Sequence, residues 1–277
     1  MEPTTDMQFT TANGTLIPAL AFGTWPLQGA EATEAVRHAL ELGYRHIDTA
    51  EAYENEDAVG AGLRASGLDR DEVYLTTKFQ RKWHGRSEVR QALEGTLSRL
   101  GVDTVDLYLV HWPNPDQDRY VEACQGLEDL RTEGKIRNWG VSNFKPHHLQ
   151  RVLDAGLAPQ VNQISVNPYG PQTEIQNFNT EHNVLTAAYS PLGRGGELLE
   201  DATLTRIGHE HGKSPAQVIL RWHLQQGRIT VPRSSNPERQ AENLAALNFE
   251  LTLAEIEAID ALNRNDPPRL DADEFGH

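Results

Sequence analysis

The chain has 277 residues, of which 38% are hydrophobic, and its 40 acidic against 25 basic residues give a formal net charge of −15. This apolar content excludes a disordered chain, and the acidic charge argues against nucleic acid or an anionic membrane as the main partner. The single cysteine cannot form an internal disulfide, and neither a signal-peptide apolar region nor the ~18 continuous apolar residues of a membrane helix occur. We therefore expect a cytoplasmic protein, and we separately predict a monomer.

The chain begins with a hairpin signal. Asn13-Gly14 lies between β-branched residues, and both residue types tolerate the positive φ angles of a tight turn. No Pro/Gly/Ser-rich linker follows anywhere in the sequence. A single domain over residues 1–277 is therefore predicted, with a short N-terminal β-hairpin.

Eight short apolar runs alternate with longer segments of helical period. The runs are residues 19–24, 44–48, 73–77, 105–110, 136–142, 159–164, 184–189 and 228–232. Connections long enough for a helix favour parallel pairing, and eight parallel strands are best accommodated by a (β/α)8 TIM barrel. An open doubly wound sheet is the alternative, but no G-x-G-x-x-G follows the first run, and Gly193-Arg194-Gly195-Gly196 lacks that spacing.

Two of the intervening segments carry clear helix signals. Within 87–100, an amphipathic stripe recurs at i, i+4, i+8 and i+11, formed by Val89, Leu93, Leu97 and Leu100. A second helix is predicted to begin after Ser214 as N-cap, with Pro215 at its first position and Gly227 beyond its end.

Polar residues follow three neighbouring runs, at the barrel face where active sites lie. They are Asp48 with Tyr53 five residues on, Lys78, and His111. A lysine beside a tyrosine lowers the tyrosine pKa, an aspartate keeps the lysine charged, and a histidine can orient a carbonyl. This set suits carbonyl reduction, although it contains no hydride donor.

Each of these residues alone has a structural interpretation. Asp48 with Glu51 is typical of a helix capping box. Tyr53 could pack against a helix, Lys78 could be a solvated loop lysine, and His111 could be a satisfied semi-buried histidine. Their joint occurrence on adjacent strands favours the functional interpretation.

Seven stretches in order resemble the signatures of the aldo-keto reductases over nearly the whole chain. They are GYRHIDTAEAYENE (43–56), YLTTKF (74–79), DLYLVHWP (106–113), GVSNF (140–144), VNQISVNPY (161–169), YSPLGRG (189–195) and VPRSSNPERQAEN (231–243). The short connections resemble the prokaryotic, diketogluconate-reductase-like branch of the family.

The resemblance implies an NADPH/NADP+-dependent reductase and assigns roles to matching positions. Tyr53 would be the general acid, Lys78 the residue that lowers the Tyr53 pKa, Asp48 the partner of Lys78, and His111 the residue that orients the carbonyl. The nicotinamide and pyrophosphate would be bound by Thr24, Trp25, Ser142, Asn143, Gln163, Tyr189, Ser190, Leu192 and Gly193. Tyr189 would stack on the nicotinamide ring.

The segment after the last strand is expected to select the cofactor. Arg233, Ser234 and Arg239 match positions that bind the adenosine 2′-phosphate, and Glu242 and Asn243 match those that contact adenine. Arginine suits bidentate phosphate binding, so we predict a preference for NADPH over NADH. Arg233 stands where relatives usually have lysine.

A second departure from relatives lies in the stretch VNQISVNPY. Ser165 and Asn167 stand where relatives commonly have Glu and His. Because Gln163 is retained, we expect this departure to alter packing near the carboxamide site more than the chemistry.

The substrate would be a small-molecule carbonyl compound. An aromatic pocket is predicted from Trp25, Tyr53, Trp83, His111 and Trp112. Short loops and a short tail suggest an open site for aldehydes, α-dicarbonyls or keto-sugar compounds. No compact His/Cys cluster offers ligands, so no metal is expected. Two alternatives are a Schiff-base aldolase-type barrel using Lys78 and an NADPH-binding regulatory barrel without turnover.

Overall fold

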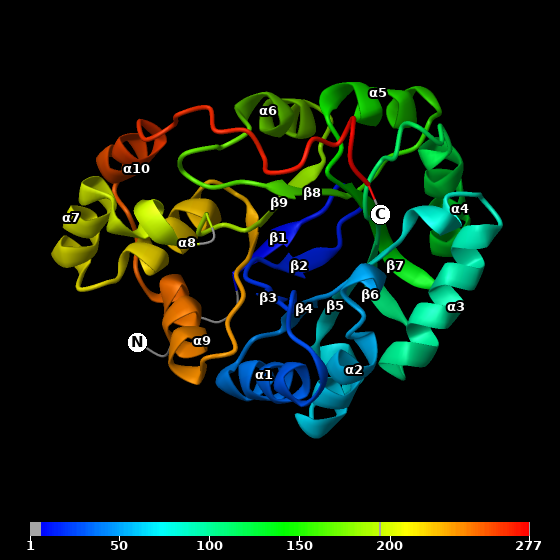
Figure 1. Cartoon of the computed structure of the whole chain (residues 1–277), viewed down its shortest axis with the longest axis horizontal. Coiled ribbons are helices and arrows are strands. Elements are labelled where there is room, and N and C mark those ends of the chain that lie inside the picture. Colours follow the sequence, from blue (N-terminus) through cyan, green and yellow to red (C-terminus); the bar gives the residue numbers. More distant parts are fainter. Residues whose placement is uncertain (1–6, 194, 277) are drawn as a thin grey trace.

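The computed structural model describes residues 7–193 and 195–276, and it is a closed barrel of parallel strands inside a ring of helices (Figure 1). Eight strands lie side by side in chain order. They are β3 (Phe22–Gly23), β4 (His46–Asp48), β5 (Tyr74–Phe79), β6 (Val105–Val110), β7 (Ile136–Ser142), β8 (Val161–Ser165), β9 (Leu185–Tyr189) and β10 (Ile229–Val231). The barrel closes where Gly23 N donates to Pro232 O at 2.9 Å and Leu20 bridges Thr230. The predicted (β/α)8 barrel is confirmed, and the open sheet is wrong.

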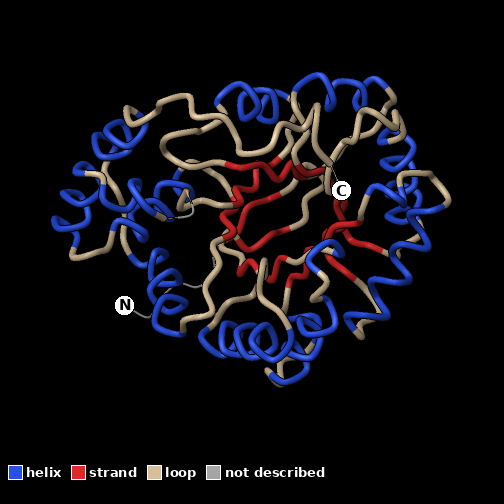
Figure 2. The backbone as a smooth tube through the Cα atoms, in the orientation of Figure 1, coloured by secondary structure: helices blue, strands red, loops and turns tan. Residues whose placement is uncertain are grey.

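Helices connect consecutive strands and form the outer ring (Figure 2). They are α1 (Gly29–Leu42), α2 (Glu56–Ala65), α3 (Glu88–Leu100), α4 (Tyr120–Thr132), α5 (Pro146–Asp154), α6 (Thr173–Glu181), α7 (Ala202–His211), α8 (Pro215–Gln225), α9 (Pro237–Leu244) and α10 (Leu253–Asp260). Short 3-10 turns are η1 (Glu51–Tyr53), η2 (Arg70–Glu72), η3 (Arg81–Trp83), η4 (Gly196–Glu200) and η5 (Ala245–Asn248). Among the helices of the described part of the chain, none is long and apolar enough to cross a bilayer.

The N-terminal hairpin lies against the end of the barrel at which the strands begin. β1 (Gln8–Thr10) pairs antiparallel with β2 (Leu16–Pro18), as the sequence predicted, and Gly14 takes the left-handed conformation with φ +84°. The Asn13 side chain donates to Asn138 Oδ1 on β7 at 2.9 Å. This contact ties the hairpin turn to the barrel and leaves the opposite end open for a site.

The predicted strand ends differ from the observed ones in informative places. β6 and β7 span the predicted residues, 105–110 and 136–142. β5 continues to Phe79, two residues beyond the predicted end, because its pairing with β6 continues through Lys78 and Phe79. Lys78 is therefore a buried strand residue and not a loop lysine.

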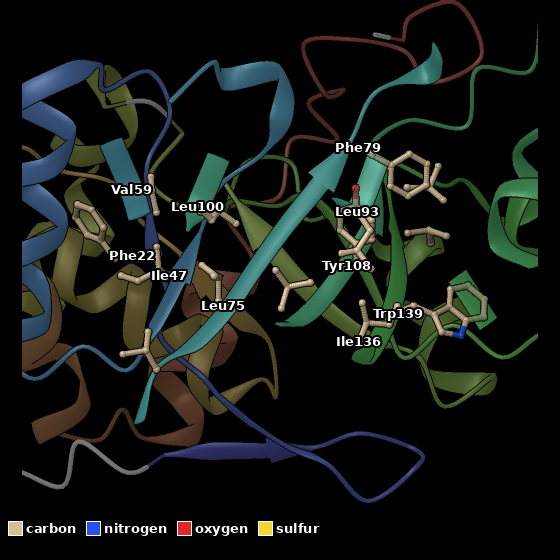
Figure 3. Packing of buried hydrophobic residues seen from close by; sticks show 14 of the residues in the cluster. Phe22, Ile47, Val59, Leu75, Phe79, Leu93, Leu100, Tyr108, Ile136 and Trp139 are labelled. Atoms are coloured by element: carbon tan, nitrogen blue, oxygen red, sulfur yellow. The ribbon is translucent and has the colours of Figure 1, made fainter. Parts of the chain in front are cut away.

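Most of the core lies between the barrel and the surrounding helices (Figure 3). Ile47 of β4 belongs to this cluster, as does the predicted stripe of α3. In α3, Val89, Leu93 and Leu100 are buried, and Leu97 is partly buried. Full burial of one such side chain contributes about 1.5–3 kcal/mol, so the stripe fixes α3 on the barrel.

The start of α8 is built as predicted. Ser214 Oγ accepts from Gln217 N at 3.3 Å, and the Gln217 side chain accepts from Ser214 N at 3.0 Å, which forms a capping box. Pro215 occupies the first helical position, and Gly227 lies beyond the end of the helix with φ +74°. The N-terminus of α8 faces the cavity described below.

His84, after η3, is predicted to make folding stability sensitive to acid. The residue is 1% exposed, and neither ring nitrogen has a hydrogen-bond partner within residues 7–193 and 195–276. Burial, with smaller effects of the Arg81 and Arg119 charges, lowers its pKa to about 4. The unfolded chain therefore binds more protons than the folded one between about pH 6.5 and 4, and stability falls as the pH falls through this window. At pH 5 the protonation of His84 in the unfolded state lowers the free energy of unfolding by about 2 kcal/mol.

Urea unfolding at pH 7 and pH 5 measures this effect. In His84→Leu the difference in unfolding free energy between the two pH values should shrink by that amount, because the unfolded state no longer takes the proton at this position. The same substitution at exposed His209 is the control. An unchanged pH dependence in His84→Leu would contradict the assignment.

Candidate active site

A cavity of about 1040 Å³ opens at the ends of the barrel strands. It extends from Asp48 and Tyr53 at one side to the segment after β10 at the other. Most residues predicted for the site line it, namely Thr24, Trp25, Asp48, Tyr53, His111, Trp112, Ser142, Asn143, Gln163, Tyr189, Ser190, Leu192, Arg233, Ser234, Arg239, Glu242 and Asn243. Parallel strands bring their carboxyl ends to one face, which is why residues so distant in sequence meet here.

Lys78 lies behind the cavity wall in a fully buried ion pair. Its ammonium donates to Asp48 Oδ1 at 2.6 Å and to Thr49 O at 2.9 Å. Burial lowers the pKa of Lys78, but Asp48 and Tyr53 outweigh it and the net change is upward. The lysine therefore stays protonated, and Asp48 forms this ion pair instead of the helix cap that its sequence context also allowed.

Tyr53 is brought beside both Lys78 and His111. The Lys78 ammonium lies 5.2 Å from the centroid of the Tyr53 ring, and the His111 ring packs edge-on against it at 5.8 Å between centroids. Burial raises the pKa of Tyr53, the Lys78 charge opposes this rise, and Asp48 adds to it. The predicted effect of Lys78 on the Tyr53 pKa has the expected direction, but burial outweighs it and the net change is upward. The phenol remains protonated at neutral pH and can donate a proton.

A chain of hydrogen bonds runs from Asp48 around the cavity wall. Gln163 Nε2 donates to Asp48 Oδ2 at 2.6 Å, and Ser142 Oγ donates to Gln163 O at 2.8 Å. Asn143 Nδ2 donates to Ser142 Oγ at 3.1 Å, and Tyr189 OH donates to Asn143 Oδ1 at 2.8 Å. These contacts fix the orientations of three polar groups and one aromatic ring along the same wall.

The far end of the cavity carries two arginines. Arg233 and Arg239 are exposed there, and neither takes part in the ion pairs formed among the described residues. Ser234 between them is buried, and its hydroxyl accepts from Asn236 N at 3.1 Å. Two arginines that pair with no carboxylate of the described residues suit a phosphate group, and in a chain of charge −15 they provide the local basic site that such a group requires.

The residues predicted along the pyrophosphate are split between the cavity wall and the loop behind it. Ser190 and Leu192 line the cavity, whereas Gly193 does not. Gly193 has φ +57°, and a Cβ at this position would approach Leu198 Cδ2 to 2.9 Å. Both features favour glycine at this position of the loop. Thr24, on the opposite side, has a buried hydroxyl oxygen with no partner among the described residues, which suits a polar ligand.

The two positions that depart from relatives lie away from the cavity lining. Asn167 Oδ1 accepts from Tyr169 N at 3.0 Å and from Gly170 N at 3.2 Å, which closes a turn after β8. Ser165 ends β8 and pairs with Tyr189. Ser165 and Asn167 therefore lie outside the cavity lining, and Gln163 lies on it.

The three tryptophans predicted for the pocket lie in different surroundings. Trp25 is 48% exposed at the cavity and Trp112 is buried in its wall. Trp83 is not among the lining residues, which corrects the prediction. Its indole nitrogen donates to the carboxylate of Glu51 at 3.1 Å, and this bond holds the ring elsewhere.

Sequence reasoning missed Gln80 and gave only a weak signal for the tail. Gln80 lines the cavity just beyond the end of β5, and Leu270 reaches it from the C-terminal segment. That segment runs from α10 past α6 towards β7 (Figure 1). Phe275 packs edge-on against Trp112 at 4.9 Å, so the tail covers part of the pocket that its short length had suggested would be open.

One group with metal-ligand chemistry lies outside the cavity, where α5 meets the tail. His147 and His148 each approach Asp273 Oδ1, at 2.9 and 3.0 Å. His148 Nδ1 accepts from Lys145 N at 3.2 Å, so the proton of the neutral ring is on Nε2, the atom that faces Asp273. With Lys145 Nζ bound to Asp273 Oδ2 at 2.6 Å, the group is a polar clamp on the tail.

Comparisons with known proteins agree with this geometry. The model of the Aldo/keto reductase family matches residues 19–264. The chain is 42% identical over 243 residues to 2,5-diketo-D-gluconic acid reductase B of Corynebacterium sp., covering 87% of this chain and 88% of that protein. It is 41% identical over 266 residues to methylglyoxal reductase DkgA of Escherichia coli, covering 95% and 96%.

A solved structure extends the similarity to three dimensions. The aldo-keto reductase of Bombyx mori in complex with NADP superposes with a TM-score of 0.87 at 35% identity, covering 94% of each chain. The fold, the matched residues and the relatives agree, and the chain belongs to the aldo/keto reductase family.

Proposed function

We propose that this chain reduces aldehydes and ketones to alcohols with NADPH. One observation supports the proposal most directly: Tyr53, backed by the Lys78–Asp48 ion pair and flanked by His111, lies on the same cavity as Arg233 and Arg239, two arginines that form no ion pair among the described residues. The first group can protonate a carbonyl oxygen and the second can bind a phosphate. The NADP complex of the Bombyx mori relative supports the choice of cofactor.

The residues of this chain would divide the chemistry between them. Bound NADPH would supply the hydride. Tyr53 donates its proton to the carbonyl oxygen, and the charged Lys78 beside it stabilises the phenolate that remains. His111 orients the carbonyl. Asp48 keeps Lys78 charged and in place, since it accepts a bond from that lysine at 2.6 Å.

The hydrogen-bonded wall would position the nicotinamide. Ser142, Asn143 and Gln163 offer amide and hydroxyl groups for its carboxamide, and Tyr189 offers an aromatic face on which the ring can stack. Glu242 and Asn243 line the end of the cavity suited to adenine. Fixing the cofactor before reaction reduces the entropy cost of the reactive geometry.

Arg239→Ala tests the cofactor assignment. If Arg239 binds the 2′-phosphate, the dissociation constant of NADPH should rise about 10- to 100-fold, the value of one lost charge-assisted hydrogen bond. The dissociation constant of NADH, which lacks that phosphate, should change by less than about threefold. Fluorescence titration of both nucleotides measures the two constants.

Arg206→Ala is the matched control, because Arg206 pairs with Glu210 on α7 and does not line the cavity. It should change neither constant. An equal loss of NADPH and NADH affinity in Arg239→Ala would contradict the assignment of Arg239 to the 2′-phosphate.

For the substrate, we propose α-dicarbonyls, aldehydes and keto-sugar compounds. The names of the Corynebacterium and Escherichia coli relatives support the first and last of these classes. The aromatic part of the wall, Trp25 and Trp112, suits small carbonyl compounds. NADPH oxidation with methylglyoxal, a nitrobenzaldehyde, a 2,5-diketo sugar acid and a β-keto ester distinguishes the classes. NADPH binding without turnover on any of them would favour a regulatory barrel instead.

A Schiff-base aldolase is disfavoured by the state of Lys78. Its amine must be neutral to attack a carbonyl, yet its pKa is raised and its ammonium is bound to Asp48 and Thr49. Covalent trapping of a carbonyl compound on Lys78 by borohydride would support the aldolase alternative.

We further propose that the chain acts as a cytoplasmic, single-domain monomer. One closed barrel and its hairpin account for the described residues, and the acidic, single-cysteine composition supports this setting. Light scattering coupled to gel filtration measures the mass in solution.

A further inference from the structure

Glu51 is a buried carboxylate beside the reacting group that the proposed chemistry leaves unused. It begins η1, the turn that ends at Tyr53, and is 9% exposed. Glu51 does not form an ion pair with Lys78, whereas Asp48 does. Its partners lie instead on the segment that follows β5.

Three donors from that segment converge on the Glu51 carboxylate. Gln80 N donates to Oε2 at 3.1 Å, Trp83 Nε1 donates to both oxygens at 3.1 Å, and Lys82 Nζ lies 2.9 Å from Oε1. A backbone amide, an indole and an ammonium thus share one acceptor. Burial raises the pKa of Glu51, but Lys82, Trp83 and Gln80 outweigh burial and lower it overall, so the group is ionised at neutral pH.

These bonds connect the two backbone segments that carry the proton donor and its charged neighbour. η1 holds Tyr53, and Gln80 follows Lys78 by two residues. The Lys78–Asp48 pair joins the strands β4 and β5 themselves, whereas Glu51 joins the turns that leave them. η1 has little internal support, since a turn this short forms few backbone bonds. Gln28 Nε2 provides another external contact, to Tyr53 O at 2.7 Å.

We propose that Glu51 is a positioning residue that holds the Tyr53 turn at its working distance from Lys78 by fastening it to the segment Gln80–Trp83. The same bonds account for the position of Trp83 outside the cavity. A carboxylate suits this task because it accepts from several donors at once, whereas an amide would present its own donors to them. The inference rests on the proposed role of Tyr53 as general acid.

Glu51→Gln keeps the size of the side chain but removes its charge and replaces one of its two acceptor oxygens with an NH2 donor. We expect kcat for methylglyoxal to fall about 10- to 100-fold, because a small displacement of a catalytic group has an effect of this size. KM and the NADPH dissociation constant should stay within about threefold. The deuterium isotope effect on kcat with C4-deuterated NADPH should stay the same or increase, since the chemical step becomes slower.

Three variants separate positioning from other roles. Glu54→Gln makes the same chemical change at an exposed position of the same turn and should leave kcat unchanged. Lys82→Ala removes only the exposed ion-pair partner of Glu51 and should lower kcat by less than about twofold. Trp83→Phe removes one donor and should lower kcat by less than Glu51→Gln does. The double variant Glu51→Gln/Trp83→Phe should have the same kcat as Glu51→Gln alone, or a higher one.

The outcomes are distinct. If wild-type protein and Glu51→Gln turn over equally well per folded molecule, or if only KM or thermal stability changes in Glu51→Gln, Glu51 does not position Tyr53, while the proposed function stands. If wild-type protein reduces no carbonyl compound, the proposed function itself fails. If Tyr53→Phe is fully active, the assignment of Tyr53 as general acid fails, and the role of Glu51 that rests on it fails too.

Discussion

Tyr53→Phe is expected to lower kcat/KM for carbonyl reduction by about 100- to 10,000-fold, the usual contribution of a positioned general acid. Phenylalanine keeps the ring that packs against His111 at 5.8 Å but has no proton to donate. NADPH binding should be retained within about threefold, because the arginine end of the cavity is untouched. Stopped-flow NADPH oxidation and nucleotide titration measure the two quantities separately.

Tyr108→Phe is the matched control for this prediction. Tyr108 is buried in the core on β6 and does not line the cavity. Its loss of a hydroxyl should leave reduction unchanged. If Tyr53→Phe retained more than about a tenth of wild-type turnover, Tyr53 would not be the proton donor.

Lys78→Met should have the second largest effect, on both turnover and stability. The substitution leaves the Asp48 carboxylate buried without its cation, which costs about 3–5 kcal/mol of unfolding free energy. Turnover should fall about 100-fold or more, because the phenolate formed at Tyr53 loses its stabilising charge. Urea unfolding and kcat, measured on the same preparation, give both values.

The double variant Asp48→Asn/Lys78→Met separates the two effects. A neutral amide at position 48 removes the buried charge and can still bond to Gln163, so most of the lost stability should return. Turnover should not return, because the cation is still missing. Recovery of turnover together with stability would show that Lys78 has only a structural role.

The barrel could be predicted from the sequence because its signals are local and repeated. The run at 105–110 is buried throughout and coincides with β6, as expected for a parallel strand covered on both faces. The end of β5 was placed two residues early because Lys78 reads as a loop residue. Its burial depends on Asp48, which lies on another strand, and a local pattern does not show such a partner.

The positions of the site residues could be predicted from the sequence, but the balance between opposing effects on the Tyr53 pKa could not. Asp48, Tyr53 and His111 meet because parallel strands end at one face. The direction of the Tyr53 pKa depends on whether burial or the Lys78 charge is larger, and that balance exists only in three dimensions. The displacement of Trp83 has the same origin, since Glu51 holds its indole away from the cavity although nothing in the spacing pairs the two.

The tail shows a further limit of the sequence. Residues beyond Pro268 are few and polar, which suggested an open pocket. Lys145, just before α5, and His147, in its first turn, bind Asp273 and hold the tail across the barrel face, and Phe275 then reaches Trp112. Contacts between segments more than a hundred residues apart have no local signature.

The central claim is that hydride from NADPH and a proton from Tyr53 meet at one carbonyl group in this cavity. The most direct test uses NADPH carrying deuterium at the transferable C4 position, with methylglyoxal as substrate, and mass spectrometry of the product. The expected result is one deuterium on the alcohol carbon with wild-type protein and almost none with Tyr53→Phe over the same time. NADPH oxidation without deuterium in the product, or equal labelling by both proteins, would contradict the claim.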